Sequence, residues 1–146
     1  MPINQAFRGR SYAPSEPYAV TRGKIREFAD AIGDPNPAYS DVAAAKALGH
    51  PDLVAPPTFP IVLTMEVAAQ AVHDPELGVD YRRVVHGQQR FRYARPLFAG
   101  DEVVGTLRIG DIATLGRSEV LSTEVELSTT AGATVCTAYS ALVVRP

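Results

Sequence analysis

The chain has 146 residues, of which 46% are hydrophobic and 21% charged, and its formal net charge is −2. These values fit one globular domain with its own hydrophobic core, so we predict a single domain over residues 1–146. The 14 Lys and Arg residues are scattered along the chain, which argues against a nucleic-acid partner, because phosphate binding needs a concentrated basic surface.

The composition also argues against disulfides, metals and membranes. Cys136 is the single cysteine, so no internal disulfide can form. Apart from this cysteine, the chain has only three histidines, which are dispersed. No metal-ligand spacing exists, and we expect no metal and no cofactor. No apolar run approaches the ~20 residues that span a bilayer. The N-terminal "MPINQAFRGRSY" lacks the pattern of a secretion signal, and we expect no membrane partner and a cytoplasmic location.

The first half of the chain predicts a short strand and two helices. "PYAV" (17–20) reads as the strand, and Thr21 is placed to cap a helix over 22–32. The helix spacing predicts one buried face, made of Ile25, Phe28, Ala29 and Ile32. Gly33 ends this helix. Ser40 or Asp41 then caps a short helix over 42–48, which Gly49 ends.

The stretch "PIVLTMEVAAQAVH" (60–73) is apolar on nearly every side, with Glu66 and Gln70 as its polar members. Such a helix is normally buried all round. Four alternating, β-branched runs follow at 83–97, 101–113, 118–129 and 133–145, separated by short glycine-bearing turns. This order predicts an α+β hot-dog fold, in which an antiparallel sheet wraps around a long apolar central helix. Because one sheet leaves an edge and a helix flank uncovered, we expect two protomers to pair, with the ligand channel between them.

The loop "GDPNPAYSD" (33–41) and the small-residue helix after it resemble the signature of MaoC-like (R)-specific enoyl-thioester hydratases and dehydratases. That signature reads Gly-Asp-x-Asn-Pro-x-His. The resemblance extends over nearly the whole chain, including "VAPPTF" (54–59), the apolar helix and "RFRYARPLFAGDEV" (90–103). It implies that Asp34 and Asn36 hold the positions of the family's catalytic aspartate and asparagine.

Two departures from this signature affect catalysis. Tyr39 stands where the family has its histidine, and a free tyrosine ionises near pH ~10 against ~6.5 for histidine, so it is a poor base. The family's oxyanion stretch is of the Ala-His-Gly type, whereas Pro56 and Pro57 here have no N–H to donate. Thr58 is then the nearest backbone donor. We expect Pro57, Thr58 and the neighbouring Phe59 to contact substrate.

Both losses together are similar to the His-less, N-terminal-half hot dogs of the family, such as the binding subunits of actinobacterial (3R)-hydroxyacyl-ACP dehydratases. The resemblance implies a subunit that binds an acyl-CoA or acyl-ACP thioester. It would act as a homodimer or as a heterodimer. In the heterodimer, a catalytic MaoC-like subunit would supply the catalytic residues.

Three alternatives stay open. "VVHGQQRF" (84–91) interrupts an apolar alternation with His86, Gly87 and Gln88, which a plain core strand would not favour. A stand-alone homodimeric enoyl-CoA hydratase could therefore use Asp34 and His86, while Gly87 and Gln88 contact the thioester. A hot-dog thioesterase would use Glu66, because a carboxylate on an apolar helix is costly to bury unpaired. A non-enzymatic acyl-CoA sensor or scaffold is the third alternative.

Overall fold

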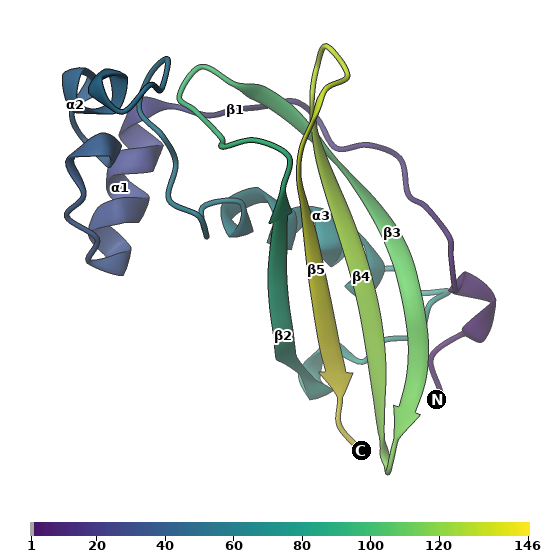
Figure 1. The fold of residues 1–146 in the computed structure, drawn as a ribbon. Helices are drawn as coiled ribbons and strands as arrows, with labels where there is room; N and C mark the ends of the chain where they lie inside the picture. The colour runs from purple at the N-terminus through teal and green to yellow at the C-terminus, as the bar shows by residue number, and fades with distance from the viewer. Residues whose placement is uncertain (1) are drawn as a thin grey trace.

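The computed structural model describes residues 2–146 and consists of one five-stranded sheet with three helices (Figure 1). The helices are α1 (Arg22–Ile32), α2 (Val42–Ala47) and α3 (Ile61–Val72), and the strands are β1 (Tyr18–Ala19), β2 (Val84–Tyr93), β3 (Glu102–Leu115), β4 (Ser118–Thr129) and β5 (Thr134–Val144). Short 3₁₀ turns occupy Gln5–Phe7, Pro37–Tyr39 and Tyr81–Arg83. The element order therefore matches the one predicted from the sequence.

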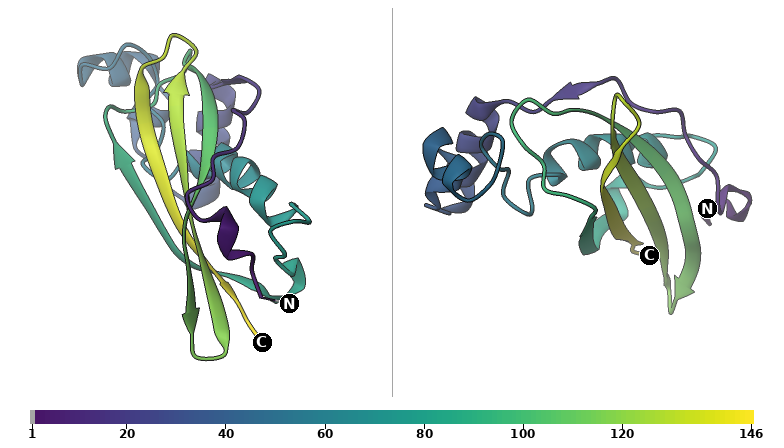
Figure 2. Two further views of the ribbon diagram at one scale, coloured as in Figure 1. Left: turned by 90° about the vertical axis from the view of Figure 1, so that its right-hand side faces the viewer. Right: turned by 45° about the horizontal axis from the view of Figure 1, so that its top comes forward.

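The strands run antiparallel in the order β1-β3-β4-β5-β2, and the curled sheet holds α3 against one face (Figure 2). This confirms the α+β hot-dog fold. Helix and sheet approach closely at Gly105 of β3, where an added Cβ would lie 2.8 Å from Val67 Cγ2. Any side chain there would push α3 away from the sheet, so a glycine fits the position.

The caps and ends of α1 and α2 follow the sequence closely. Thr21 Oγ1 accepts a hydrogen bond from Lys24 N at 3.1 Å, and Gly33 ends α1 with a positive φ of 70°. Asp41 caps α2 by accepting from Ala43 N at 2.9 Å, which settles the choice between Ser40 and Asp41. Both helices lie beyond one end of the sheet, on the side of β2 (Figure 1).

The predicted burial is wrong at two places. Ile25 and Ala29 of α1 are buried, but Ile32 is 48% exposed, because the last turn of α1 extends past the packed region. The prediction that α3 is buried all round is also wrong within this chain. Leu63 and Val67 are buried against the sheet, whereas Met65 is 57% exposed. The sheet covers one flank of α3 and leaves the other apolar flank open to the surface.

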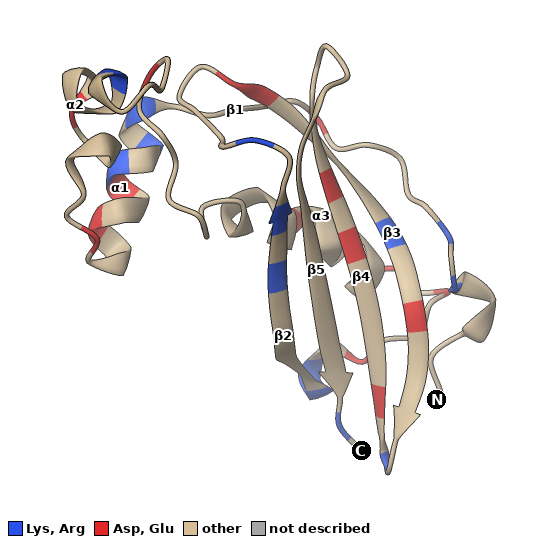
Figure 3. Cartoon of the chain, in the orientation of Figure 1, with Lys and Arg blue, Asp and Glu red and all other residues tan. Residues whose placement is uncertain are grey.

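Charged residues lie along several strands of the sheet (Figure 3). In Figure 3, β2 carries bands of basic residues and β4 carries acidic ones. Arg90 places its guanidinium 4.4 Å from the Tyr139 ring on β5, so it packs on the outer face. No helix among residues 2–146 is both long enough and apolar enough to cross a membrane.

Candidate functional site

The loop that carries the family signature is held by its own side chains. Asp34 Oδ1 accepts a hydrogen bond from Asn36 N at 3.1 Å, and Asn36 Oδ1 accepts from Ala38 N at 3.0 Å. The second bond caps the 3₁₀ turn that contains Tyr39. One oxygen of each signature side chain is therefore used to fix the turn, as is common for Asx residues.

Tyr39 occupies the histidine position of the signature and is buried. Burial raises the pKa of its phenol above the ordinary value, and the negative charge of Asp34 raises it further. The phenol thus keeps its proton at neutral pH. In chemical terms Tyr39 can donate a hydrogen bond to a ligand oxygen, but it cannot take a proton from water.

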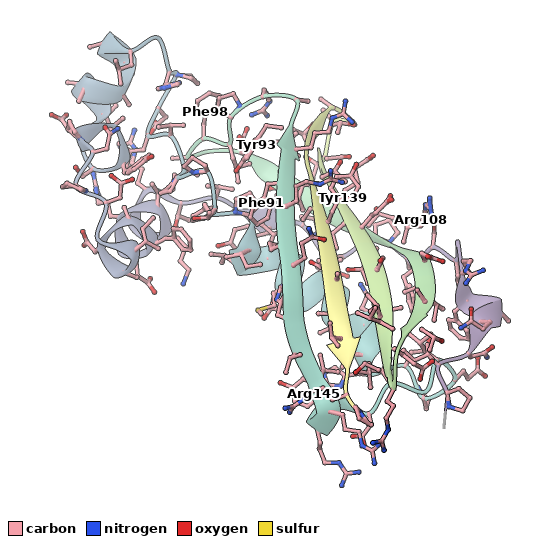
Figure 4. The ribbon with its side chains drawn as sticks, turned by 60° about the horizontal axis from the view of Figure 1, so that its bottom comes forward. Phe91, Tyr93, Phe98, Arg108, Tyr139 and Arg145 are labelled. Atoms are coloured by element: carbon pink, nitrogen blue, oxygen red, sulfur yellow. The ribbon has the colours of Figure 1, made fainter. Side chains whose placement is uncertain are left out.

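Asn36, Tyr39 and Pro57 line a cavity of about 480 Å³, which we call the loop pocket. Tyr93, at the end of β2, closes one side of it, and Figure 4 shows Tyr93 and Phe98 near the α1–α2 part of the molecule. The loop pocket also contains the half-buried His50, a residue for which the sequence alone predicts no role. Its position directly before the extended "PDLVAPP" segment was the available signal.

A second cavity of about 480 Å³ runs along α3, between the helix and strands β2, β4 and β5. We call it the helix channel. Most of its wall area is apolar, although several polar side chains also line it. The residues are Ile61, Thr64, Met65, Ala68, Ala69, Val72, His73, Tyr81, Arg82, Val84, His86, Gln89, Val125, Ala138, Ser140 and Leu142.

A third hollow, of about 550 Å³, lies at the start of α3 and brings together most of the predicted thioester contacts. We call it the channel mouth, because it shares Ile61, Met65, His86 and Gln89 with the helix channel. Thr58, Gly87, Gln88, Phe28, Ile32 and Phe91 complete its lining.

His86 and Gly87 belong to a β-bulge in β2, where the pairing with β5 shifts between His86 and Gln88. His86 Nε2 lies 3.1 Å from the backbone oxygen of Gln88. An added Cβ at Gly87 would lie 3.0 Å from Val143 Cγ2, so the bulge is crowded against β5 and a glycine fits there. The break in alternation seen in "HGQQ" is this bulge, which turns Gln89 inward and leaves Gln88 at the surface.

The structure separates the other predicted residues. Asp34 accepts a hydrogen bond from Asn36, which lines the loop pocket, whereas His86 lines the channel mouth. Among the residues described, no hydrogen bond or ion pair joins Asp34 and His86. Phe59 is fully buried and meets Phe28 edge-on, with ring centroids 5.5 Å apart. Phe59 is therefore a core residue in the free chain, and its contact with substrate stays a prediction.

Glu66 points away from the helix channel. It is exposed and lines a separate surface hollow with Tyr18 and Gln70. Because the surface position keeps its carboxylate in water, Glu66 needs no buried partner. Within residues 2–146, no group of three or more His, Cys, Asp or Glu side chains is arranged to hold a metal ion.

Comparison with known proteins agrees with this architecture. The family model described as "FAS1-like, dehydratase domain region" matches residues 6–138. A UPF0336 protein of Thermobifida fusca (strain YX) is 59% identical over 145 residues, which are 99% of this chain and 95% of that protein. A UPF0336 protein of Streptomyces coelicolor is 52% identical over 99% of this chain and 97% of its own length.

Two solved structures are similar over nearly the whole chain. One is a chain of the C-terminally truncated HadBC (3R-hydroxyacyl-ACP dehydratase) complex from Mycobacterium tuberculosis, with a TM-score of 0.85, 28% identity, and coverage of 94% of this chain and 96% of that one. The other is a MaoC-like dehydratase, with a TM-score of 0.90 and 29% identity, over 97% of this chain and 43% of that one. The chain therefore belongs to the FAS1-like dehydratase domain region family and has the MaoC-like hot-dog fold.

Proposed function

We propose that this chain is the acyl-thioester-binding, non-catalytic subunit of a (3R)-hydroxyacyl-thioester dehydratase or (R)-enoyl hydratase. The observation that carries the proposal is the protonated, buried Tyr39 at the position of the signature histidine. Hydration and dehydration need a group that exchanges a proton with water near neutral pH. Tyr39 does not meet that requirement, so the catalytic base has to come from a second subunit.

The helix channel supports binding of an acyl chain. It is a largely apolar cavity next to α3, and it opens at the channel mouth, whose wall is also mainly apolar and includes Thr58 and Gln89. Apolar walls with a few placed polar groups are typical of ligand pockets. Thr58 lies at this opening and is exposed. This supports a contact of its N–H or hydroxyl with a thioester carbonyl, with the pantetheine arm of CoA or ACP extending outward.

The uncovered flank of α3 supports a second hot-dog subunit. Met65 is 57% exposed and Val85 on β2 is 39% exposed, and β2 is at the edge of the sheet, paired only with β5. An edge strand beside exposed apolar side chains is a surface that proteins normally cover. The similar HadBC chain comes from a complex of two different proteins, which favours a heterodimer with a catalytic MaoC-like subunit over a homodimer.

The test is turnover of crotonyl-CoA by the purified chain, alone and after co-expression with a short hot-dog protein of its host that has the complete Asp-x-Asn-Pro-x-His loop. We expect negligible hydration by the chain alone and hydration by the co-purified pair. Robust hydration by the chain alone would contradict the proposal. Acyl-CoA binding without turnover, unchanged by the second protein, would instead indicate a sensor or scaffold.

A stand-alone hydratase is the second candidate, and one observation favours it. His50 lies in the loop pocket with Asn36 and Tyr39, so an imidazole is present beside two signature positions, although not at the signature place. In that case hydration by the chain alone would be lost in His50→Ala. Loss in His86→Ala would assign the reaction to the channel mouth instead, and CoA release abolished by Glu66→Gln would reveal a thioesterase.

A further inference from the structure

A row of polar side chains crosses the inner, otherwise apolar face of the sheet. Ser140 of β5 pairs with Gln89 of β2 on one side and with Thr123 of β4 on the other. The three residues therefore stand side by side on neighbouring strands. Leu121 and Val125, which flank Thr123 on the same face, are both buried. Thr64 on α3 lines the helix channel together with Gln89 and Ser140.

Three of these four residues have a buried polar atom with no hydrogen-bond partner within the chain. The atoms are Thr64 Oγ1, Gln89 Nε2 and Thr123 Oγ1. Thr64 is only 3% exposed and Thr123 only 2%. Buried polar atoms without a partner are uncommon in proteins because each loses the hydrogen bonds it had with water. Two of them, on Thr64 and Gln89, line the helix channel, and the third is on Thr123, the strand neighbour of the channel residue Ser140. Together they indicate a place where a ligand completes the hydrogen bonding.

The remaining contacts determine which kind of atom fits. Ser140 Oγ donates to Gln89 Oε1 at 2.7 Å, which uses the amide oxygen and fixes the orientation of the side chain. The amide nitrogen, which carries two N–H donors, is then the free end of Gln89. The Thr64 hydroxyl supplies another O–H donor. Two sets of donors next to an apolar channel call for an acceptor oxygen on the ligand.

We propose that Thr64 and Gln89, with Ser140 and Thr123 behind them, form a polar subsite that binds an acceptor oxygen of the acyl ligand. The subsite lies where the channel mouth joins the helix channel, because Gln89 lines both. The oxygen is either the thioester carbonyl or a hydroxyl or keto group on the acyl chain. Hydrocarbon beyond it packs along Ala68, Val72 and Leu142. This inference rests on the proposed acyl-thioester function. It adds that the chain prefers ligands with an acceptor oxygen at this position.

The test measures binding of three ligands to the purified chain, or to the two-subunit complex where co-expression yields one. The ligands are octanoyl-CoA, S-octyl-CoA, which lacks the thioester carbonyl, and a set of hydroxyoctanoyl-CoA isomers. The proteins are the wild type, Thr64→Val, Gln89→Met and the control Thr137→Val. Thr137 lies on β5 next to buried Ala138 and, by strand alternation, faces the other side of the sheet.

If the subsite holds the carbonyl, the wild type binds octanoyl-CoA about fivefold more tightly than S-octyl-CoA, a factor that corresponds to one neutral hydrogen bond. If it holds an oxygen on the chain, one hydroxyoctanoyl isomer is preferred over octanoyl-CoA by a similar factor. In either case Thr64→Val and Gln89→Met abolish the preference and Thr137→Val retains it. A wild type that shows neither preference, or variants that retain it, would overturn the subsite.

A melting experiment without ligand separates this inference from the proposed function. Thr64→Val removes a buried hydroxyl without a partner and keeps the side-chain volume, so we expect its melting temperature to rise by a few degrees. A lower melting temperature would mean that the hydroxyl is already hydrogen-bonded in the free protein. The proposed subsite would then be refuted even if acyl-CoA binds. Failure to bind any of the three ligands, with the rise in melting temperature present, would defeat the acyl-thioester function itself.

Discussion

The hydroxyl of Tyr93 donates a 2.7 Å hydrogen bond to the backbone oxygen of Pro57. This contact joins the end of β2 to the extended segment that leads into α3. The two residues also line the loop pocket together. This hydrogen bond therefore helps to hold the proline segment, whose missing N–H groups set this chain apart from the family's oxyanion pattern.

Removal of this bond tests its structural role. We expect Tyr93→Phe to lower the free energy of unfolding by about 1 kcal/mol, the usual contribution of a neutral hydrogen bond, as measured by urea denaturation. Burial also raises the pKa of the Tyr93 phenol above its ordinary value. The folded state thus retains this proton when the unfolded state loses it, and stability falls as pH rises above about 10. Tyr81→Phe, at a 68% exposed position, is the control. An equal loss of unfolding free energy in that variant would contradict a structural role for the Tyr93 hydrogen bond.

The contact between α3 and β3 depends on the absence of a side chain at Gly105. We expect Gly105→Ala to lower the free energy of unfolding by roughly 1–3 kcal/mol, the range for overpacked cores, because its Cβ would meet Val67 at 2.8 Å. Gly23 on α1 has nothing within 4 Å of an added Cβ. Gly23→Ala should therefore stabilise the protein by about 0.5–1 kcal/mol. Chemical denaturation measures the change in the free energy of unfolding of both variants. A change of the same sign in both would refute this packing.

The ion pair of Arg22 and Asp52 ties α1 to the segment before α3, with contacts of 3.0 and 2.7 Å. The hydrogen bond from Arg22, together with the N–H of Leu53, lowers the pKa of the Asp52 carboxyl to about 2. A lowered pKa stabilises the fold above the unfolded value of ~3.9, and this contribution is lost as the pH falls through the folded value. We expect Asp52→Asn to flatten the stability profile between about pH 4 and pH 2. Asp30→Asn, at an exposed position on α1, should leave that profile unchanged.

The role of Tyr39 can be tested by restoring the histidine of the signature. We expect Tyr39→His to hydrate crotonyl-CoA measurably, because general bases contribute about 10²–10⁴-fold. Its rate should rise with pH through ~6.5, as the imidazole loses its proton. Tyr39→Phe is the matched control, since it removes the hydroxyl without adding a base. Equal activity in the two variants would show that position 39 is not where a base acts.

Local sequence determined the elements of this protein because their signals are short-range. Thr21 and Gly33 mark the ends of α1, Asp41 caps α2, and alternating β-branched residues define the strands. These are interactions of the backbone with side chains a few residues away, and they hold whatever the rest of the chain does. The signature loop was likewise visible in the sequence, together with the loss of its histidine.

The tertiary structure alone decided which of these side chains share a cavity. His50 lines the loop pocket and Phe59 lies in the core. The bulge at Gly87 directs Gln89 inward, where it lines the helix channel together with Thr64. No local pattern carries this information, because it depends on strand register and on how closely α3 approaches the sheet. A shift of one residue in register moves a whole strand's side chains to the opposite face, and only the packed fold fixes that choice.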